Sequence, residues 1–342
     1  MRLLTTLYIT DHQAKIGVRD GSILVKAPTS GWERFPVEAI EAIIVVGRAQ
    51  VTSDALALCA QKGVRVTSLS GGGRLRYTSG PGTGGNVMLR WRQYRAAEDE
   101  THSLAVVRIL VAGKLTNAEH VMRRWVADAP VSVRRALSRL GSQVSEQVEK
   151  AALATTGDQA RGCEGNGTRA YFEGLRLHLL QVRSDLSFFN RNRRPPRDQV
   201  NATMSFCYGL MLSDIKGALE GVGLDPQIGF LHKLRPGRPS LALDLLEEFR
   251  PSVVDRFTVS CIARRMLDAD SFVSTPGGGC YLSDAGRKDL LAAWDRYRSE
   301  DLSHPLLGRR VPRAALPILQ STIMARHLRG DLPQYAPYIC PT

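Results

Sequence analysis

The sequence predicts an α+β protein in which a β-rich N-terminal domain precedes a mostly α-helical domain. Three observations predict it: short apolar or alternating segments up to Thr78, a turn-rich linker (SGPGTGG, residues 79–85), and helical periodicity after that linker. We therefore expect two domains, at residues 1–85 and 86–342. A chain of 342 residues, 43% of them hydrophobic, is long enough to bury a sizeable core.

Short strands are expected throughout the N-terminal domain, at residues 3–9, 15–18, 22–26, 34–36, 42–46, 64–69 and 74–78. Asp20-Gly21 stands between two of them and is typical of a tight hairpin turn. The run 42–46 is apolar throughout, which predicts a buried strand. Between the strands, the Thr52–Asp54 segment can cap a helix that runs to about Lys62.

Three consecutive glycines, Gly71 to Gly73, invite a phosphate-loop interpretation. We reject it because no GxGxxG pattern follows and no P-loop lysine is present. A glycine turn between two strands is the simpler account, so a nucleotide-dependent enzyme has little support.

Helices are expected after the linker at residues 86–97, 103–117, 118–127, 131–140, 144–154, 162–180, 199–219, 253–267, 284–299 and 312–329, and from about residue 240. Pro317 could kink the last of them. Residues 272–282 predict a small hairpin, and the tail 331–342 is expected to be extended. Trp91 and Tyr94 lie among arginines and could contact nucleic acid, but we favour packing into a helical interface.

Composition restricts the partners and the compartment. Lysine plus arginine outnumber aspartate plus glutamate by 46 to 33, a net charge of +13, which favours nucleic acid over membrane as a polyanionic partner. The alternative is a merely basic protein. We see no signal peptide and no apolar run long enough to span a membrane, so we expect a cytoplasmic protein. Six scattered cysteines without a CxxC pair indicate neither a zinc site nor a disulfide framework.

The richest candidate site is residues 229–251, GFLHKLRPGRPSLALDLLEEFRP. His232 lies in an expected loop, and Ser240 is a plausible N-cap of the helix that follows. Asp244 and Glu247 are three apart and share one helical face. If that face is buried, both carboxylates require a positive partner, and a metal ion with His232 as another ligand would supply it. The alternative, which this stretch alone favours, is that they are solvated or paired with Arg235 or Arg238.

Glu164 lies in GCEGNGTRAYF, in the first turn of an expected helix or just before it. Gly165 and Gly167 lower helix propensity there and allow a backbone or a ligand to approach closely. Glu164 could complement the helix dipole or bind a metal, and spacing does not decide between these roles.

A second basic segment, residues 188–198 (FFNRNRRPPRD), carries four arginines on a loop stiffened by Pro195-Pro196, and Asp198 can cap the next helix. Such a loop suits phosphate groups. The alternative is a solvated charged loop.

Three segments in this order, GCEGNGTRAYF, FFNRNRRPPRDQVNATMSFCYGLM and IGFLHKLRPGRPSLALDLLEEFRP, resemble the CRISPR-associated integrase that acquires new spacers, the first protein of the Cas series. LYITDHQAKIGVRDGSILV also looks like the opening strands of that family, and GGNVMLRWRQYRAA like its entry to the helical domain. The resemblance therefore covers nearly the whole chain. Within this family the chain resembles the integrases of type I systems, and subtype C is the subtype that we expect.

The resemblance implies a β-rich N-terminal domain that contributes to a homodimer and an α-helical, metal-dependent catalytic domain. It implies that two dimers flank a dimer of a small companion protein, the second of the Cas series, in a heterohexamer. Glu164, His232 and Glu247 carry over as catalytic metal ligands for Mg²⁺ or Mn²⁺. The family position of Glu247 is aspartate in some members and glutamate in others. We rank Asp244 after it, as a ligand or an orienting group.

The implied reaction is a transesterification, in which the 3′-hydroxyl of an incoming DNA fragment attacks a phosphodiester at the border of a CRISPR repeat. The same site could cut DNA with water as the nucleophile. The substrate would be double-stranded and partly single-stranded DNA. Asn201 and Tyr208 look like helix-packing residues near the site. The candidates to hold DNA backbone are Arg191, Arg193, Arg194, Arg197, Arg235 and Arg238.

The rival interpretation is a non-catalytic DNA-binding scaffold in which the carboxylates only pair with arginines. It predicts DNA binding without metal-dependent strand transfer.

Overall fold

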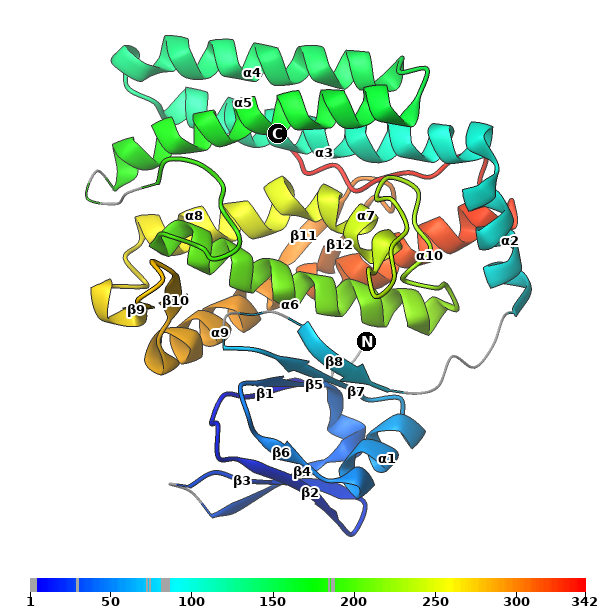
Figure 1. The fold of residues 1–342 in the computed structure, drawn as a ribbon, viewed down its shortest axis with the longest axis vertical. Helices are drawn as coiled ribbons and strands as arrows, with labels where there is room; N and C mark the ends of the chain where they lie inside the picture. The colour runs from blue at the N-terminus through cyan, green and yellow to red at the C-terminus, as the bar shows by residue number, and fades with distance from the viewer. Residues whose placement is uncertain are drawn as a thin grey trace.

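The structure is a computed structural model, and it describes residues 5–28, 31–71, 73, 75–80, 87–183, 185 and 188–342. Strands gather at one end of the molecule and helices form the rest, which confirms the predicted α+β class (Figure 1). Most of the expected linker, residues 81–85, and the first two residues of the expected strand 3–9 lie outside the described residues.

Two four-stranded sheets form the N-terminal part. The first has the order β1-β5-β7-β8 and joins β1 (Thr5–Ile9), β5 (Ile40–Val46), β7 (Arg65–Leu69) and β8 (Leu75–Ser79). The second has the order β4-β3-β2-β6 and joins β4 (Trp32–Pro36), β3 (Ser22–Lys26), β2 (Lys15–Arg19) and β6 (Gln50–Val51). Between these strands lie a 3₁₀ turn, η1 (Val37–Ala39), and the helix α1 (Ser53–Gln61).

Strand β5 runs parallel to its neighbours β1 and β7 and is buried on both faces. Ile43 and Val45 join a core that includes Ile16 and Ile23 of the second sheet. Ile44 and Val46 alternate with them and join the core of the helical part. This double burial accounts for the unbroken apolar run, because a strand covered on both faces has no solvent side for polar residues.

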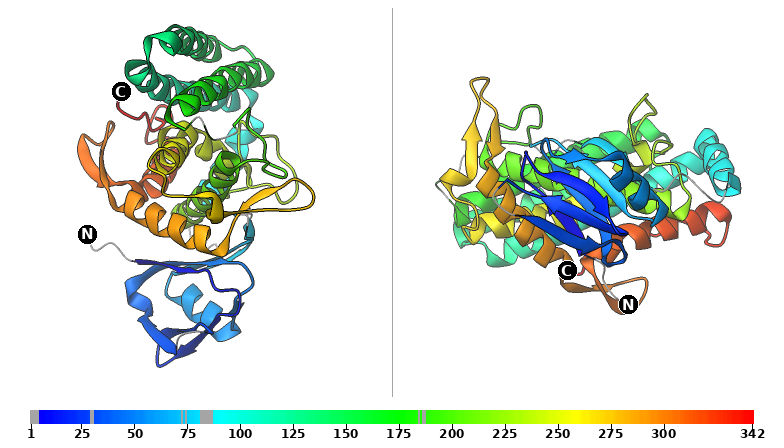
Figure 2. Two further views of the ribbon diagram at one scale, coloured as in Figure 1. Left: turned by 90° about the vertical axis from the view of Figure 1, so that its left-hand side faces the viewer. Right: turned by 90° about the horizontal axis from the view of Figure 1, so that it is seen from below.

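Nine α-helices of the described chain follow the sheets. They are α2 (Val87–Glu98), α3 (Glu100–Asp128), α4 (Val131–Ala152), α5 (Gly157–Val182), α6 (Gln199–Val222), α7 (Ser240–Phe249), α8 (Arg256–Ala263), α9 (Asp284–Ser299) and α10 (Leu316–Arg329). Helices α3, α4 and α5 form a layer at the end farthest from the sheets, and α6 lies between that layer and the first sheet (Figures 1 and 2).

Short elements connect and extend these helices. They are η2 (Arg250–Asp255), η3 (Ala269–Ser271), η4 (Arg313–Ala315), the antiparallel pair β9 (Phe272–Ser274) and β10 (Cys280–Leu282), and the antiparallel pair β11 (Asp301–His304) and β12 (Arg309–Pro312). The first hairpin confirms the one expected at 272–282, and the second hairpin and β6 were not expected.

The first sheet packs closely on α6. A Cβ added to Gly209 of α6 would lie 2.0 Å from the carbonyl oxygen of Gly73, and one added to Gly73 would lie 2.6 Å from Cα of Phe206. Gly73 also has a φ of +77°, which favours glycine. Glycine is therefore required on both sides of this contact between the β-rich and helical parts.

Several predicted helix boundaries are wrong. The helices expected at 103–117 and 118–127 are the single helix α3, and those expected at 131–140 and 144–154 are the single helix α4. Helix α5 begins at Gly157, where the Thr156 side chain accepts from the Gln159 N–H, so Glu164 is seven residues inside it. A helix-dipole role for Glu164 is excluded, because that effect falls off within the first turn.

Proline changes two other boundaries. The helix expected at 253–267 is a π-helical segment, η2, followed by α8, and Pro251 at its start cannot donate a backbone hydrogen bond. Pro317 lies in the first turn of α10, so it begins the helix rather than kinking it. Pro239, not Ser240, is the N-cap of α7, and the Ser240 hydroxyl donates instead to the Lys233 carbonyl at 3.4 Å.

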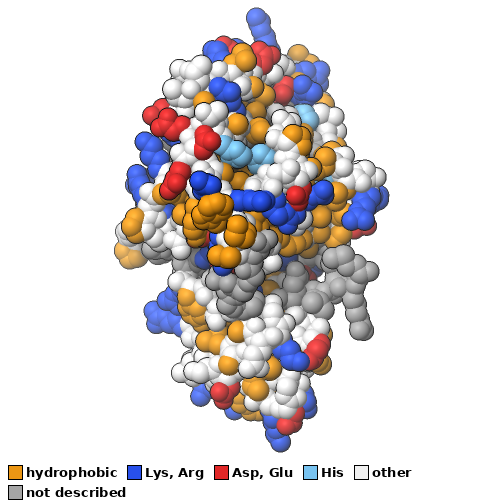
Figure 3. All heavy atoms as spheres, turned by 90° about the vertical axis from the view of Figure 1, so that its right-hand side faces the viewer, with side chains coloured by type: hydrophobic (Ala, Val, Ile, Leu, Met, Phe, Trp, Pro, Cys, Tyr) orange, Lys and Arg blue, Asp and Glu red, His pale blue; other side chains and the backbone are white. Residues whose placement is uncertain are grey.

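The aromatic residues of α2 do not pack as we expected. Trp91 is 49% exposed and Tyr94 is 40% exposed. The Arg95 guanidinium lies 4.5 Å from the centroid of the Trp91 ring. The side of the molecule that carries α2 faces the viewer in Figure 3, where Lys and Arg side chains lie beside exposed hydrophobic ones. In the described part of the chain, no helix combines the length and apolarity needed to cross a membrane. All six cysteines are free.

Candidate active site

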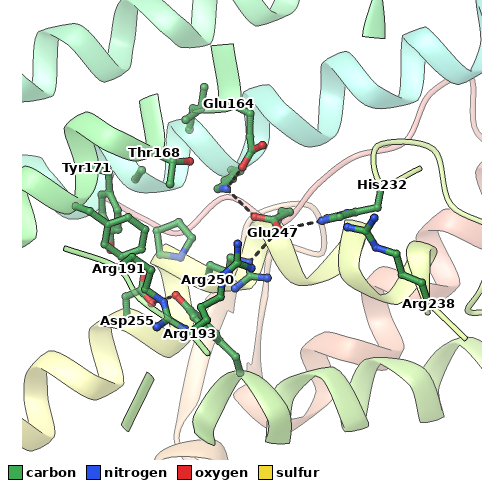
Figure 4. Close-up of a pocket in the computed structure, with 16 residues that line it drawn as sticks. Glu164, Thr168, Tyr171, Arg191, Arg193, His232, Arg238, Glu247, Arg250 and Asp255 are labelled. Carbon is green, nitrogen blue, oxygen red and sulfur yellow. Dashed lines mark hydrogen bonds and ion pairs between the residues drawn. The ribbon is translucent and has the colours of Figure 1, made fainter. Parts of the chain in front are cut away.

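A cavity of about 330 Å³ lies between α3 and α5 on one side and α6, α7 and η2 on the other. Glu164, His232 and Glu247 all line it, although they are far apart in the sequence (Figure 4). Glu164 comes from α5, Glu247 from α7, and His232 from the loop between α6 and α7. The structure therefore brings together the three residues that the resemblance implied as ligands.

Asp244 lies one helical turn before Glu247 and is fully buried. Its carboxylate accepts the backbone N–H groups of Phe230 at 2.6 Å, Leu231 at 3.0 Å and His232 at 2.9 Å. It also accepts from His232 Nδ1 at 2.7 Å. All these partners belong to the loop between α6 and α7, residues 223–239, which we call the site loop. Asp244 therefore holds this loop in place and orients its histidine.

The orientation of His232 matters chemically. A neutral imidazole that donates from Nδ1 keeps the lone pair of Nε2 free for a ligand. His232 Nε2 points toward Glu247 and lies 3.8 Å from its Oε1. The prediction that Asp244 acts as an orienting group therefore fits this geometry better than the prediction that it is a direct ligand.

Two further contacts hold the site loop in place. Gln93 of α2 is buried, donates from Nε2 to the carbonyls of Asp225 and Ile228 at 2.8 Å each, and accepts the Asp225 N–H at 2.9 Å. Gly229 packs so closely that an added Cβ would lie 2.6 Å from both Asp244 Oδ2 and the Leu241 nitrogen. The loop therefore reaches its place only with glycine at that position.

Glu247 is only 4% exposed, so the interpretation that these carboxylates are solvated is wrong. Their partners are also not Arg235 or Arg238. Lys114 of α3 lies between Glu164 and Glu247, and its Nζ donates to Glu164 Oε1. The same Nζ lies 2.7 Å from Glu247 Oε2 and forms an ion pair with it. The angles of this ion pair fall outside those of a regular hydrogen bond.

Arg250, one turn after Glu247, donates from Nε to Glu247 Oε1 at 3.0 Å. Burial opposes ionisation of Glu247, but the positive charges of Arg250 and Lys114, with His232, outweigh it and lower the pKa of the carboxyl. Burial also opposes the charge on Lys114, and its two glutamates outweigh that cost, so its pKa is raised. Glu247 and Lys114 therefore form a buried ion pair in which both side chains are charged.

A second buried carboxylate, Asp255 of η2, lies in the wall of the same cavity. Tyr208 donates to its Oδ1, and Tyr171 donates to its Oδ2 at 3.0 Å. Burial raises the pKa of Asp255 to about 6, although both tyrosines and the nearby Arg250 and Arg191 lower it. Tyr208 thus has a polar role beyond the expected helix packing, and Arg191 and Arg250 lie 5.3 and 4.4 Å from the centroid of its ring.

The arginine-rich loop divides into two kinds of residue. Arg191 donates to Asn201 Oδ1 at 2.7 Å and Ser205 Oγ at 3.0 Å, so it ties the loop to α6. The fully buried Asn201 is a packing residue, as expected. Arg193 of this loop is exposed and lines the cavity. The half-buried Arg238, which belongs to the loop before α7, lines it as well. Arg194, Arg197 and Arg235 are exposed and lie outside the cavity lining. Asp198 caps α6 by accepting the Asn201 N–H at 2.8 Å, as predicted.

Sequence reasoning missed Lys114, Arg250 and Asp255. Lys114 carries a recognisable signal, because it falls on the apolar stripe of α3 together with Leu110 and Val111, where a lone lysine requires a buried partner. Arg250 follows Glu247 at the helical spacing of an ion pair. Asp255 ends a buried run, and nothing in the sequence places Tyr171 and Tyr208 beside it.

The donor set suits a divalent metal. Two carboxylates and an imidazole Nε2 face one cavity, and the space between the carboxylates already holds a positive charge. Within the described ranges, however, no three His, Cys, Asp or Glu side chains stand close enough together to hold an ion in this arrangement. The residue types therefore suit Mg²⁺ or Mn²⁺, although the Lys114 ammonium lies between the two carboxylates in this arrangement.

Buried carboxylates, an oriented histidine and surrounding arginines define a candidate centre for chemistry on a phosphate-containing substrate. The comparisons with known proteins agree with the fold. The family model described as "CRISPR associated protein Cas1" matches residues 7–296, and the chain belongs to this family. A relative from Rhodospirillum rubrum, "CRISPR-associated endonuclease Cas1 2", is 38% identical over 344 residues, which cover 98% of each chain.

Solved structures share the fold. A casposase bound to its integration product has a TM-score of 0.83 at 21% identity, covering 97% of this chain and 92% of the casposase. A chain of a Cas6-RT-Cas1–Cas2 complex also has a TM-score of 0.83, at 19% identity, and the match covers 99% of this chain and 36% of the longer one. At these identities the likeness concerns the fold. That the chain belongs to a type I system, and to subtype C, stays a prediction.

Proposed function

We propose that this protein is a metal-dependent DNA integrase and endonuclease that inserts new spacer DNA into a CRISPR array. The observation that supports it most is the convergence of Glu164, His232 and Glu247 on one cavity whose wall also carries arginines. Family membership supports the same reaction, because the Rhodospirillum relative is named an endonuclease.

In this proposal Glu164, His232 Nε2 and Glu247 hold Mg²⁺ or Mn²⁺, and Asp244 keeps the imidazole oriented through Nδ1. When bound, the metal would act as a Lewis acid on the scissile phosphodiester and stabilise its developing negative charge. The 3′-hydroxyl of the incoming DNA would lose its proton and form the new phosphodiester bond, while the bond from phosphorus to the 3′-oxygen of the repeat-DNA strand breaks and that oxygen leaves as a 3′-hydroxyl. No side chain has to act as a nucleophile. Arg193 and Arg238, on two sides of the cavity, would bind phosphate oxygens.

We also propose the assembly that the resemblance implies: a homodimer that joins a Cas2-like companion in a heterohexamer on double-stranded, partly single-stranded DNA. The net charge of +13 supports DNA as a partner. A chain of the same fold occurs in a complex with Cas2, which supports the companion.

One observation favours the scaffold interpretation. Glu247 is already neutralised by Lys114 and Arg250, so its burial is explained without a metal. The scaffold would bind DNA equally well with or without divalent metal and would transfer no strands.

A strand-transfer assay with the companion protein, with and without Mn²⁺, tests the proposal. Wild-type protein should join a DNA fragment to repeat DNA only with metal, and Glu164→Ala and His232→Ala should abolish joining while their dimers stay folded. Glu173→Ala is a matched control, because this glutamate lies on the same helix and pairs with Arg176 at the surface. Wild-type rates in either folded site variant, or joining without metal, would contradict the proposal.

A further inference from the structure

The feature that carries a further inference is the position of Lys114. Its ammonium lies between the carboxylates of Glu164 and Glu247, two of the three proposed metal ligands. The side chain is 9% exposed and lines the cavity. A divalent metal held by both glutamates would need the space where this ammonium lies, and two cations cannot share it without strong repulsion.

The backbone that carries Lys114 has little freedom to move. On one side, Gly113 packs against the C-terminal segment, residues 331–342. A Cβ added to Gly113 would lie 2.8 Å from Cγ of Pro337. On the other side, a Cβ added to Gly167 of α5 would lie 2.5 Å from Cδ2 of Leu115. One helical turn away, Asn117 donates to the carbonyls of Glu248 at 2.9 Å and Tyr338 at 2.8 Å. Helix α3 is therefore held in place, and any adjustment is made by the lysine side chain.

Lys114 also explains how both glutamates stay close together without a metal. Two carboxylates facing one cavity repel each other, and burial makes each more costly. Glu247 has Arg250 as a second cation, whereas every salt bridge formed by Glu164 within the described chain involves Lys114. The Lys114 ammonium therefore neutralises both carboxylates in the space that a metal held by them would take.

We propose that Lys114 is a resident cation that competes with the divalent metal for Glu164 and Glu247, so that metal binding requires its side chain to move away from them. This inference rests on the proposed function. It predicts that removing the lysine charge strengthens metal binding, whereas a lysine that only supports the ligands would weaken metal binding when removed.

The first test measures metal affinity on the full-length protein without DNA. Lys114→Met keeps an unbranched apolar side chain that ends one atom earlier, and it removes the charge. Titration with Mn²⁺, followed by electron paramagnetic resonance of the free ion, should give a Kd lower than wild type by about tenfold or more. Lys150→Met is the matched control, because Lys150 pairs with Glu146 at the surface of α4, and its Kd should be unchanged.

An unchanged or weaker Mn²⁺ affinity in Lys114→Met would overturn the inference and leave the proposed function standing. Absence of Mn²⁺ binding to the wild type and both variants would overturn the proposed function, and the inference with it.

A second test uses the wild type and does not depend on whether the variant folds. Acetylation of lysines by an amine-reactive ester, read residue by residue by mass spectrometry, should become several-fold faster at Lys114 when Mn²⁺ binds, because the ammonium leaves its carboxylates. Acetylation of Lys150 should not change. Bound Mn²⁺ with no change at Lys114 would overturn the inference.

Discussion

Asp244 and Glu247 show how two carboxylates on one helical face take different roles. Asp244 accepts three backbone N–H groups and a histidine Nδ1, which uses its hydrogen-bonding capacity within the protein. Within the part of the chain that the structure describes, the Glu247 carboxylate meets the side chains of Lys114, Arg250 and His232, and it faces the cavity. We therefore propose Glu247 as the metal ligand and Asp244 as the group that orients His232.

We therefore expect Asp244→Ala and Glu247→Gln to fail in different ways. Asp244→Ala leaves buried N–H groups unpaired, each costing roughly 1–3 kcal/mol, so its melting temperature should fall sharply. Glu247→Gln should melt closer to wild type and lose strand transfer and Mn²⁺ binding. Thermal melting and transfer per folded molecule measure the two effects. A folded, inactive Asp244→Ala beside an active Glu247→Gln would reverse our assignment.

Asp255 predicts a pH dependence of stability. Its folded pKa of about 6 lies above the ordinary aspartate value of 3.8, so the folded state binds this proton more tightly. The contribution to stability is fully present below pH 3.8 and is lost as the pH rises through 6, by up to roughly 3 kcal/mol. Asp255→Asn stays neutral, so its melting temperature relative to wild type should rise between pH 4 and pH 7.

The control for this experiment is Asp289→Asn, at an exposed position on α9 that does not line this cavity. A constant difference between Asp255→Asn and wild type across the same range would show that Asp255 does not titrate there.

At the scale of elements, the arginine-rich loop combines a structural and an exposed part. Arg191 is bound to α6, so Arg191→Ala should lower the melting temperature. Arg193 and Arg194 are exposed, so replacing both with alanine should leave stability unchanged and weaken DNA binding across sequences. The salt slope of binding should fall by about 0.9 for each duplex phosphate that the protein no longer neutralises, or about 0.7 on single strands.

Arg123→Ala is a suitable control for DNA binding, because this residue is 60% exposed on α3 and pairs with Glu119 away from the loop. An unchanged salt slope in the folded double variant would mean that Arg193 and Arg194 do not bind DNA backbone.

Elements were predictable from the sequence to the extent that their signals are local. The strands 22–26 and 42–46 and the helix 284–299 follow from apolar periodicity and turn residues near their ends. The long helices α3 and α4 were divided wrongly, because tertiary packing carries a helix across residues that look like local breaks. The π-helical turn at Pro251 has no sequence signal comparable to a cap.

The candidate site was predictable only through its motifs. Glu164, His232 and Glu247 carry them, and the family resemblance connects segments that periodicity cannot connect. Lys114 lies in an ordinary helix, and its role appears only when α3 packs against α5 and α7. A lone lysine on the apolar stripe of α3 indicates a buried partner, but it does not identify the two glutamates, so structure was needed to find them.

At the scale of the whole molecule, the C-terminal segment, residues 331–342, packs against α7 and α3, the helices that carry Glu247 and Lys114. The Glu248 carboxylate accepts from Tyr335 Oη and the Tyr338 N–H at 2.6 Å each, and from Gln320 Nε2 at 3.1 Å. Burial raises the pKa of Glu248 to about 8, although these hydrogen bonds lower it. The Cys340 N–H donates to Asn117 Oδ1 at 2.7 Å, so the segment binds both α7 and α3.

This arrangement predicts that the last residues of the chain stabilise the catalytic helices from a distance. Removing residues 335–342 would take the Tyr335 and Tyr338 donors from Glu248 and the Tyr338 and Cys340 partners from Asn117. The truncated protein should therefore melt far lower than wild type and bind Mn²⁺ more weakly. Tyr335→Phe removes one of these hydrogen bonds and should lower the free energy of unfolding by roughly 1–3 kcal/mol. Removing the exposed Thr342 alone should change neither quantity. If the truncated protein melts like wild type, the segment only lies against α3 and α7, and the positions of Lys114 and Glu247 do not depend on it.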